Sequence, residues 1–218
     1  MHARVKAAIT KHGLARSGII ILDALLKLRQ VCCDPKLLKL KTTQRAHVGT
    51  AKLDRLMNLL EVLLGENRRI LIFSQFTSML ALIEAQLNAA EIDYVLLTGD
   101  TKDRATPVRL FQAGKVPVFL ISLKAGGVGL NLTAADTVIH YDPWWNPAVE
   151  DQATDRAHRI GQDKKIFVHR LVTLATIEEK METLKDRKRA LVASVLDAEH
   201  GGALKLTEAD IEELFAPT

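Results

Sequence analysis

Three side chains in the second half of the chain have types and spacing suited to binding an anion. Gln152, Arg156 and Arg159 lie at i, i+4 and i+7, so on a helix they form one polar stripe. Two permanently charged guanidiniums beside an amide would present several hydrogen-bond donors to an anionic group. The alternative is a solvated helix face on which Asp151 and Asp155 pair with the arginines.

The residues around this stripe predict the helix that would position it. Asn146 can act as the N-cap, Pro147 fits the first helical position, and Gly161 is a natural stop. The sequence therefore predicts a helix over 147–160. An apolar face for the core would come from Ala153, Ala157 and Ile160.

Short apolar runs before and after this helix predict a parallel β-sheet. The runs are Ile70–Phe73, Tyr94–Leu97, Val118–Ile121, Val138–Tyr141 and Ile166–Val168. Continuous apolar runs of this length are typical of strands buried on both faces. Helical patterns at 75–90, 103–113, 128–133 and 147–160 alternate with them. The predicted fold class is a doubly wound α/β sheet covered by helices.

Polar residues follow the ends of four of these predicted strands. They are Ser74, Thr98-Gly99, Ser122 and Tyr141-Asp142. Ligands of such sheets bind beyond the carboxyl ends of the strands, so we expect these residues on one edge.

Helical segments flank the predicted sheet on both sides. A helical pattern over 17–33 ends at Asp34-Pro35, and another over 52–64 is closed by Gly65. Thr176 opens a capping box for a helix that extends to about residue 196. Thr207 caps a final short helix.

The charge of the chain is unevenly distributed. The net charge is +4, but residues 1–50 carry ten Lys/Arg and two acids, which is +8, so the remainder is −4. A basic segment can contact a phosphate backbone, because lysine and arginine release condensed counterions there. A solvated connector is the alternative interpretation.

Several other classes of site and location are disfavoured. No apolar run reaches transmembrane length and no signal-peptide layout is present, so we expect a cytoplasmic or nucleoid-associated location, nuclear in a eukaryote. Cys32 and Cys33 are adjacent and indicate buried small groups rather than a metal cluster or a disulfide. The seven histidines show no metal-ligand spacing.

Glycine-rich segments allow three phosphate-binding interpretations. Gly13 and Gly18 have P-loop spacing, but Ile19-Ile20 replaces the required Lys-Ser/Thr pair. The segment from Gly127 resembles a dinucleotide fingerprint, but Leu132 occupies its third glycine position, which disfavours an oxidoreductase. The third interpretation is a strand-end loop whose bare backbone approaches a nucleotide or nucleic-acid phosphate.

Three longer segments resemble helicase motifs V and VI of the SWI2/SNF2 branch of superfamily 2. They are Ile121–Leu132, Asp142–Pro147 and Gln152–Gln162, and the last contains the specific string Asp-Arg-Ala-His-Arg-Ile-Gly-Gln. Leu28–Leu38 resembles the family's lead-in to its second RecA-like lobe, and Ile72–Phe76 resembles motif IV. Leu97–Asp100 with Arg104 resembles the motif after that.

The resemblance implies a fold and a division into domains. The fold would be a RecA-like, P-loop NTPase-like lobe with helical N- and C-terminal extensions. Residues 1–50 would form a basic helical lead-in and linker, residues 51–175 the helicase C-terminal lobe, and residues 176–218 a brace helix with a final short helix.

The resemblance also implies roles for individual residues. Arg156 and Arg159 match the family's arginine fingers, and Gln152 matches the leading glutamine of motif VI. Gly127, Gly129 and Asn131 match motif V, which couples nucleotide to nucleic acid. The positions expected to contact DNA are Ser74, Gln75, Thr98, Gly99, Ser122, Lys124 and Trp145. For Trp145, a core aromatic is the equally weighted alternative.

As a function, the resemblance implies the second motor lobe of an ATP-dependent double-stranded DNA translocase. The implied cofactors are ATP and Mg²⁺, with Mg²⁺ held by a first lobe that carries a P-loop and an acidic box. These 218 residues contain no Asp-Glu dipeptide, so we expect the chain alone to hydrolyse ATP only at background rate. The implied partners are double-stranded DNA, the first lobe, and a DNA-bound protein such as RNA polymerase or histones, with no membrane.

Two other functions remain open at this point. One is a non-catalytic nucleic-acid or protein-binding module of the same fold, against which the two arginines argue. The other is an RNA helicase lobe, against which the Arg-Ile-Gly-Gln ending and the Trp-Asn-Pro segment argue.

Overall fold

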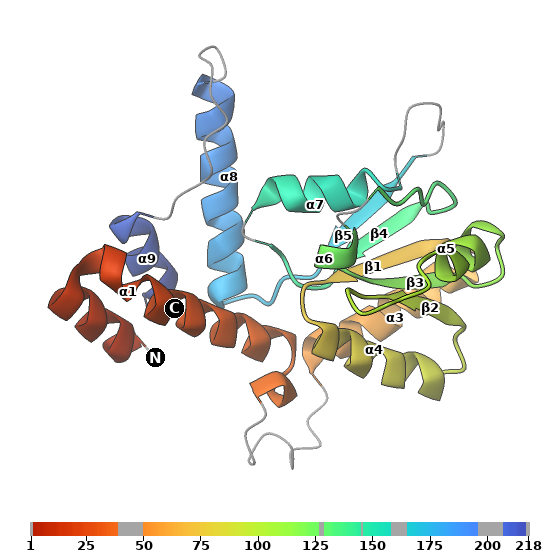
Figure 1. The fold of residues 1–218 in the computed structure, drawn as a ribbon, viewed down its shortest axis with the longest axis horizontal. Coiled ribbons are helices and arrows are strands. Elements are labelled where there is room, and N and C mark those ends of the chain that lie inside the picture. The colour runs from red at the N-terminus through yellow and green to blue at the C-terminus, as the bar shows by residue number, and fades with distance from the viewer. Residues whose placement is uncertain are drawn as a thin grey trace. The chain divides into compact units, whose positions relative to one another are not determined.

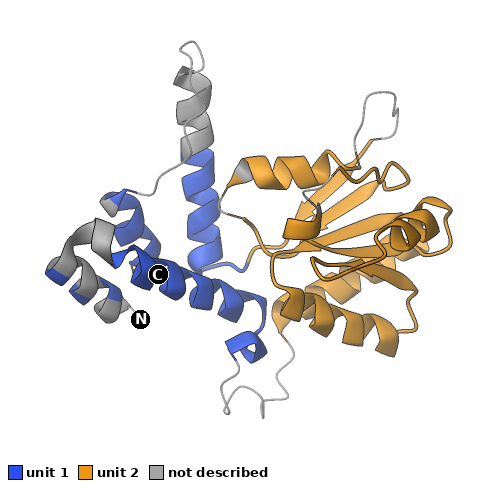
Figure 2. Cartoon of the chain, in the orientation of Figure 1, with its two compact units in different colours: residues 1–46, 173–218 blue, residues 47–172 orange. Residues whose placement is uncertain are grey.

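The computed structural model describes residues 2–38, 50–126, 129–144, 146–157, 165–195 and 207–216. The chain divides into two compact units, shown in different colours in Figure 2. Unit 2 is residues 47–172, and unit 1 combines residues 1–46 with residues 173–218. Each unit has its own hydrophobic core.

Unit 2 is built on one five-stranded sheet (Figure 1). The strands are β1 (Ile70–Ser74), β2 (Tyr94–Leu97), β3 (Val118–Ser122), β4 (Thr137–His140) and β5 (Phe167–Arg170). All neighbouring strands are parallel, in the order β2-β3-β1-β4-β5. The chain starts in the middle and winds first to one side and then to the other, so the predicted doubly wound parallel sheet is confirmed.

Burial differs between the middle and the edges of the sheet. Every residue of β1, β3 and β4 is buried, as the continuous apolar runs predict. The prediction of burial on both faces is wrong for the edge strands. In β2 three residues are half-buried and Leu97 is fully buried, and in β5 Phe167 and Val168 are 46% and 37% exposed. An edge strand has a neighbour on one side only, so its side chains are less completely covered.

Five helices of unit 2 connect or precede these strands. They are α3 (Ala51–Gly65), α4 (Thr77–Ala89), α5 (Ala105–Gln112), α6 (Leu123–Gly126) and α7 (Pro147–Thr154). Figure 1 shows α3 and α4 on one side of the sheet and α6 and α7 on the other. Leu56 and Leu60 of α3 and Met79 and Ile83 of α4 are fully buried.

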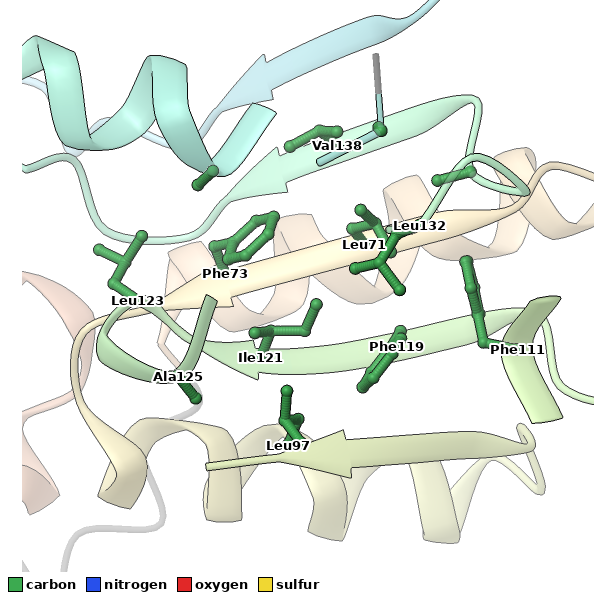
Figure 3. Packing of buried hydrophobic residues seen from close by; sticks show 13 residues of the cluster. Leu71, Phe73, Leu97, Phe111, Phe119, Ile121, Leu123, Ala125, Leu132 and Val138 are labelled. Carbon is green, nitrogen blue, oxygen red and sulfur yellow. The ribbon is translucent and has the colours of Figure 1, made fainter. Parts of the chain in front are cut away.

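The core on the α6–α7 side is a cluster that Figure 3 shows from close by. Alternate strand residues supply it, because successive side chains of a strand point to opposite faces. Phe111 of α5 is fully buried and its ring lies 5.4 Å from that of Phe119. Burial of each large side chain of this kind contributes about 1.5–3 kcal/mol. The strand residues of the cluster are Leu71, Phe73, Leu97, Phe119, Ile121 and Val138.

Two local predictions in unit 2 are wrong. Residues 129–132 are not helical, and the helical turn α6 lies earlier, directly after β3. Gly65 is still part of α3, as its last residue, and does not itself terminate the helix. The left-handed conformation after the helix occurs at Asn67, with φ of 57°. Asparagine tolerates this region because its short polar side chain can bond locally.

The regular structure in the described residues of unit 1 is helical. α1 (His2–Cys33) is longer than the predicted 17–33, and η1 (Pro35–Leu38), α8 (Ile177–Val195) and α9 (Glu208–Phe215) complete it. Gly13 and Gly18 lie inside α1, which agrees with the rejection of a P-loop there. Its core includes Ile21, Ala24, Ile177, Met181, Ile211 and Leu214.

The predicted ends of the unit 1 helices are largely confirmed. Cys32 and Cys33 are the last two residues of α1, and Cys32 is half-buried while Cys33 is fully buried. Thr207 forms a complete capping box with Asp210. At α8 the box is displaced by one residue: the Thr176 hydroxyl accepts from the Glu178 N–H at 3.2 Å, and Glu179 accepts from the Ala175 N–H at 2.8 Å.

No described helix is both long enough and apolar enough to cross a membrane.

Candidate functional site

The carboxyl ends of four strands lie side by side in unit 2. Ser74 pairs in register with Ser122, and Leu97 pairs with Ile121, which sets Thr98 beside Ser122. On the other side of β1, the Tyr141 N–H donates to the Phe73 carbonyl at 2.9 Å. The residues predicted to share one edge therefore do so, in the order Thr98, Ser122, Ser74 and Tyr141.

Three of these edge residues, Ser122, Ser74 and Tyr141, lie below the surface. Ser74 is fully buried and Ser122 is 3% exposed. The Ser74 hydroxyl accepts from the Phe76 N–H at 3.1 Å, and the Ser122 hydroxyl accepts from the Ala125 N–H at 3.3 Å. Both hydroxyls thus fix the turns that leave their strands, and in this conformation neither is at the surface.

The neighbouring edge residues are accessible. Lys124 and Gly99 are exposed, and Gln75 and Thr98 are partly exposed. The Gln75 N–H donates to Asp142 Oδ2 at 3.1 Å, and the Thr98 N–H donates to Thr101 Oγ1 at 2.9 Å. These backbone contacts hold the loops, and at this edge the Lys124 side chain is exposed, whereas Gln75 is only partly exposed and its amide nitrogen is buried. Whether they contact DNA stays a prediction.

Residues 129–134 form a loop that is held from two sides. Gly129 has φ of 49°, in the left-handed region that favours glycine, and a Cβ there would meet no atom within 4 Å. A glycine is therefore favoured at position 129 by the backbone conformation and not by a lack of room for a side chain. Asn131 is exposed, and its carbonyl accepts from Gln112 Nε2 at 3.0 Å.

Helix α7 starts as predicted but ends early. The Asn146 side chain accepts from the Ala148 N–H at 3.1 Å and Pro147 occupies the first turn, so the predicted N-cap is confirmed. The helix ends at Thr154, whereas the sequence predicts an end near residue 160. The Arg156 and Ala157 N–H groups bond three residues back, at 3.3 and 2.9 Å, so the backbone tightens into turns.

The early end of α7 changes the predicted polar stripe. Gln152 is exposed on the helix, while Arg156 is partly exposed in the following turn. The α-helical hydrogen bonding continues to the Asp155 N–H, which donates to the Asp151 carbonyl at 2.8 Å, and tightens at Arg156. The Arg156 carbonyl accepts from the Leu132 N–H at 3.0 Å, which joins this turn to the 129–134 loop.

A buried polar cluster lies between α7 and the ends of β4 and β5. Glu150 is fully buried, and its Oε1 accepts from the Trp144 N–H at 2.6 Å. Its Oε2 accepts from Arg170 Nε at 3.2 Å. His140 is fully buried, and its Nε2 lies 3.1 Å from the Thr154 hydroxyl.

The start of α5 is fixed by an acid with a perturbed pKa. Asp103 accepts from the Ala105 and Thr106 N–H groups, both at 3.1 Å. Hydrogen bonds from the Thr106 side chain and backbone, supported by that from Ala105, lower the pKa of this carboxyl below its usual value. The adjacent Arg104 donates from Nη2 to the Ala125 carbonyl at 2.7 Å, which ties α5 to the loop after β3.

Four predicted site positions or neighbours lie outside the described residues: Gly127, Trp145, Arg159 and the Gly161-Gln162 end of motif VI. Their predicted roles therefore stay predictions. Gln152, Arg156, Gly129 and Asn131 are the described members of the predicted nucleotide site.

The described donors suit a phosphate better than a metal ion. Gln152 is exposed and Arg156 is partly exposed, both side chains carry N–H groups, and guanidinium groups match phosphate oxygens well. Among the residues that the structure describes, no group of three or more His, Cys, Asp or Glu could hold a metal ion. The described residues thus fit the phosphates of a nucleotide such as ATP.

Sequence reasoning missed two residues that organise the site. Gln112 holds the 129–134 loop, and no pattern in the sequence points to it. Glu150 carries a detectable signal, because it lies three residues before Ala153 and seven before Ala157, on the apolar stripe of the helix. A carboxylate at a core-facing position of an otherwise apolar stripe indicates a buried polar contact.

The sheet order, the polar carboxyl edge and the Arg156 turn together define a RecA-like helicase C-terminal domain. The family model described as helicase conserved C-terminal domain matches residues 51–161. The predicted fold class is thereby confirmed.

Similarity to solved structures shows which helicase family this domain comes from. The chain is 31% identical to the Sulfolobus solfataricus SWI2/SNF2 ATPase C-terminal domain, with a TM-score of 0.70 over 97% of this chain and 87% of that one. It is 35% identical to the Sulfolobus solfataricus SWI2/SNF2 ATPase core in complex with dsDNA, with a TM-score of 0.71 over 89% of this chain and 41% of that one. The chain therefore belongs to the SWI2/SNF2 family, as its C-terminal RecA-like lobe.

Curated relatives are much longer than this chain. The putative ATP-dependent helicase/translocase YwqA of Bacillus subtilis (strain 168) is 39% identical over 207 residues, which is 93% of this chain and 22% of that protein. The chain spans about a fifth of the length of this relative and of two mycoplasma helicases, and a smaller share of the chromatin-remodelling relatives it matches.

Proposed function

We propose that this chain is the second motor lobe of an ATP-dependent double-stranded DNA translocase. In this proposal Arg156 and Arg159 act as arginine fingers on the γ-phosphoryl group, with Gln152 beside them. The carboxyl edge of the sheet contacts the DNA backbone. The relative named as a core in complex with dsDNA supports the choice of double-stranded DNA over RNA.

The observation that carries the proposal is the 3.0 Å hydrogen bond from the Leu132 N–H to the Arg156 carbonyl. It fastens the loop that contains Gly129 and Asn131 to the turn that contains Arg156. Leu132 is fully buried, so this link is anchored in the core. A displacement of the loop would therefore displace the arginine, which is the coupling that a motor lobe needs.

The DNA contacts in this proposal are made by the accessible edge residues. Thr98, Gly99 and Lys124 reach a phosphate backbone from this edge, with the partly exposed Gln75 beside them, and Ser74 and Ser122 set the turns that present them. Contacts to phosphates position a duplex without reading its sequence, so movement along DNA would be largely sequence-independent.

Catalysis requires a first lobe in the same polypeptide. The arginines of this chain stabilise charge that develops on the transferring phosphoryl group, and a finger of this kind contributes roughly 10³–10⁵-fold in rate. When bound, ATP and Mg²⁺ supply the phosphoryl group and the neutralising charge, held by the first lobe. This chain alone would therefore hydrolyse ATP only at background rate, and we expect the complete protein to act at cellular DNA, beside DNA-bound proteins such as RNA polymerase or histones.

The test is ATP turnover by the polypeptide that joins this chain to a first lobe, with and without double-stranded DNA. We expect DNA to stimulate turnover, and Arg156→Ala or Arg159→Ala to lower it by about 10³-fold while ATP binding is retained. Arg109→Ala, which removes an exposed arginine of α5, is the control. Stimulation by RNA alone would favour an RNA helicase, and DNA binding without any turnover would favour a binding module; either result overturns the proposal.

The DNA-contacting edge has a matched pair of lysines for a second test. Lys124 follows β3 at the carboxyl edge, and Lys115 precedes β3 at the amino edge, and both are exposed. Lys124→Ala should lower the slope of log affinity against log salt by about 1, because one phosphate contact is lost. Lys115→Ala should leave the slope unchanged, and equal slopes for the two variants would contradict the proposed edge.

A further inference from the structure

A fully buried carboxylate lies at the start of the helix that leads to Arg156. Glu150 of α7 has no exposed surface, and it lies on the same helix face as the buried Ala153. An ionised carboxylate in such a position must be compensated by hydrogen bonds and an opposite charge. Its two oxygens are used differently.

The first oxygen of Glu150 closes the loop that precedes its own helix. Oε1 accepts from the backbone N–H of Trp144 at 2.6 Å, six residues earlier. The bond fixes the backbone just before the N-cap Asn146, beside Trp145, for which the family resemblance implies either a DNA contact or a core position. Trp144 itself is partly buried against the core of unit 2. A hydrogen bond to a charged acceptor is stronger than one between neutral groups.

The second oxygen pairs with the end of an edge strand. Oε2 accepts from Arg170 Nε at 3.2 Å, with the Arg170 side chain 33% exposed and that of Glu150 fully buried. Arg170 is the last residue of β5. Glu150 thus joins the Trp144 segment, α7 and β5.

The same helix is linked to the middle of the sheet. The Glu150 carbonyl accepts from the Thr154 hydroxyl at 3.0 Å, and that hydroxyl lies 3.1 Å from His140 Nε2. The His140 ring stacks on Phe73, with centroids 5.7 Å apart. Helix α7 is therefore held to the ends of β1 and β4 as well.

We propose that Glu150 is a positioning residue that couples the Trp144 segment to the turn bearing Arg156. The inference deepens the proposed function and rests on it. One end of α7 receives the Trp144 segment through Glu150, and the other end leads directly into Arg156. A movement of the Trp144 segment on DNA is thereby transmitted to the arginine through a single rigid helix.

Glu150→Gln in the two-lobe polypeptide tests the coupling. Glutamine keeps the size of the side chain and can offer its single oxygen to the Trp144 N–H, but its NH₂ group then faces Arg170 and cannot accept a hydrogen bond from it. We expect the stimulation by double-stranded DNA to fall by about tenfold, while the rate without DNA and the KM for ATP change by less than about twofold. Glu61→Gln, at an exposed position of α3, is the matched control.

Tryptophan fluorescence reports the positioning directly. The chain contains two tryptophans, Trp144 and Trp145, so its emission arises from this segment. In the 218-residue chain, Glu150→Gln should increase quenching by acrylamide, with a cooperative melt retained, and Glu61→Gln should not.

A double-mutant comparison separates coupling from general destabilisation. Arg170→Gln, at a partly exposed edge position, should lower DNA stimulation in the same direction, and the double variant should be no worse than Glu150→Gln alone. Additive losses would overturn the proposal, as would unchanged stimulation in Glu150→Gln or an equal loss of the rate without DNA. If Glu150→Gln does not fold, unchanged stimulation in Arg170→Gln overturns it. A wild-type protein that DNA does not stimulate refutes the proposed function instead.

Discussion

Buried and half-buried polar side chains in unit 2 are bonded largely to backbone groups. Arg69 illustrates this, because its Nη2 donates to the Phe111 carbonyl while the guanidinium lies 4.8 Å over the Phe111 ring. The backbone N–H of Arg69 donates to Asp136 Oδ1 at 3.2 Å. Burial lowers the pKa of Arg69, and nearby Asp136 opposes the shift. Removal of such a side chain leaves a carbonyl without that donor, which is why single substitutions here are costly.

His169 of β5 makes stability depend on pH. Burial, and secondly the positive charge of Arg55, lower the pKa of His169 below its usual 6.5. Between its folded pKa and 6.5 the unfolded chain therefore binds more protons, so the His169 contribution is present above pH 6.5 and is lost as the pH falls through the folded pKa. As the pH falls from about 7.5 to about 5.5, the melting temperature of the wild type should therefore drop by more than that of His169→Gln, which has no imidazole to protonate.

Arg55→Gln provides the control for this pH effect. It removes the second cause of the shift and should reduce the pH dependence without abolishing it, because burial is the larger cause. If the melting temperatures of the wild type and His169→Gln changed equally with pH over this range, His169 would have no such role.

At the scale of elements, the loops are fixed by helices that flank the sheet. Gln112 is the last residue of α5. Both the nitrogen and the oxygen of its side-chain amide form hydrogen bonds to the backbone of residues 131–134. Nε2 donates to the Asn131 carbonyl at 3.0 Å, and Oε1 accepts from the Ala134 N–H at 2.8 Å. This explains how a loop without regular structure can hold Gly129 and Arg156 in a defined relation.

Removal of this clamp should be measurable in the 218-residue chain. Gln112→Ala should lower the free energy of unfolding by about 1–2 kcal/mol, because backbone groups of the loop lose their partners. Gln112→Glu should recover part of the loss, since a carboxylate accepts from Ala134 but cannot donate to Asn131. Urea unfolding measures both, with exposed Gln86→Ala of α4 as control. Equal stability of Gln112→Ala and Gln86→Ala would exclude the clamp.

At the scale of the whole molecule, the chain forms one continuous unit and one discontinuous unit. Unit 2 holds the five strands and the large cluster in 47–172, while unit 1 needs both ends of the chain. In unit 1, Ile21 and Ala24 of α1 share a core with Ile177 of α8 and Leu214 of α9. Only unit 2 contains a complete core within one stretch of sequence.

This division predicts how fragments behave. Residues 47–172 expressed alone should give a helical and sheet-like circular dichroism spectrum and melt cooperatively, because their core is complete. Residues 1–46 alone should lack cooperative unfolding, since the helices that complete their core lie in 173–218. A non-cooperative melt of the 47–172 fragment would contradict this division.

The sequence by itself determined the class of fold and the family. Continuous apolar runs marked the strands, Asn146-Pro147 marked the start of α7, and the motif VI string carried the resemblance, because these signals are local. The tertiary structure decided the strand order, the exposure of Phe167 at the edge, the burial of Ser74 and Ser122, and the union of both chain ends in unit 1. It also decided that α7 stops before Arg156 and that Glu150 meets Arg170. These features depend on contacts between residues far apart along the chain, which no local pattern of residue types encodes.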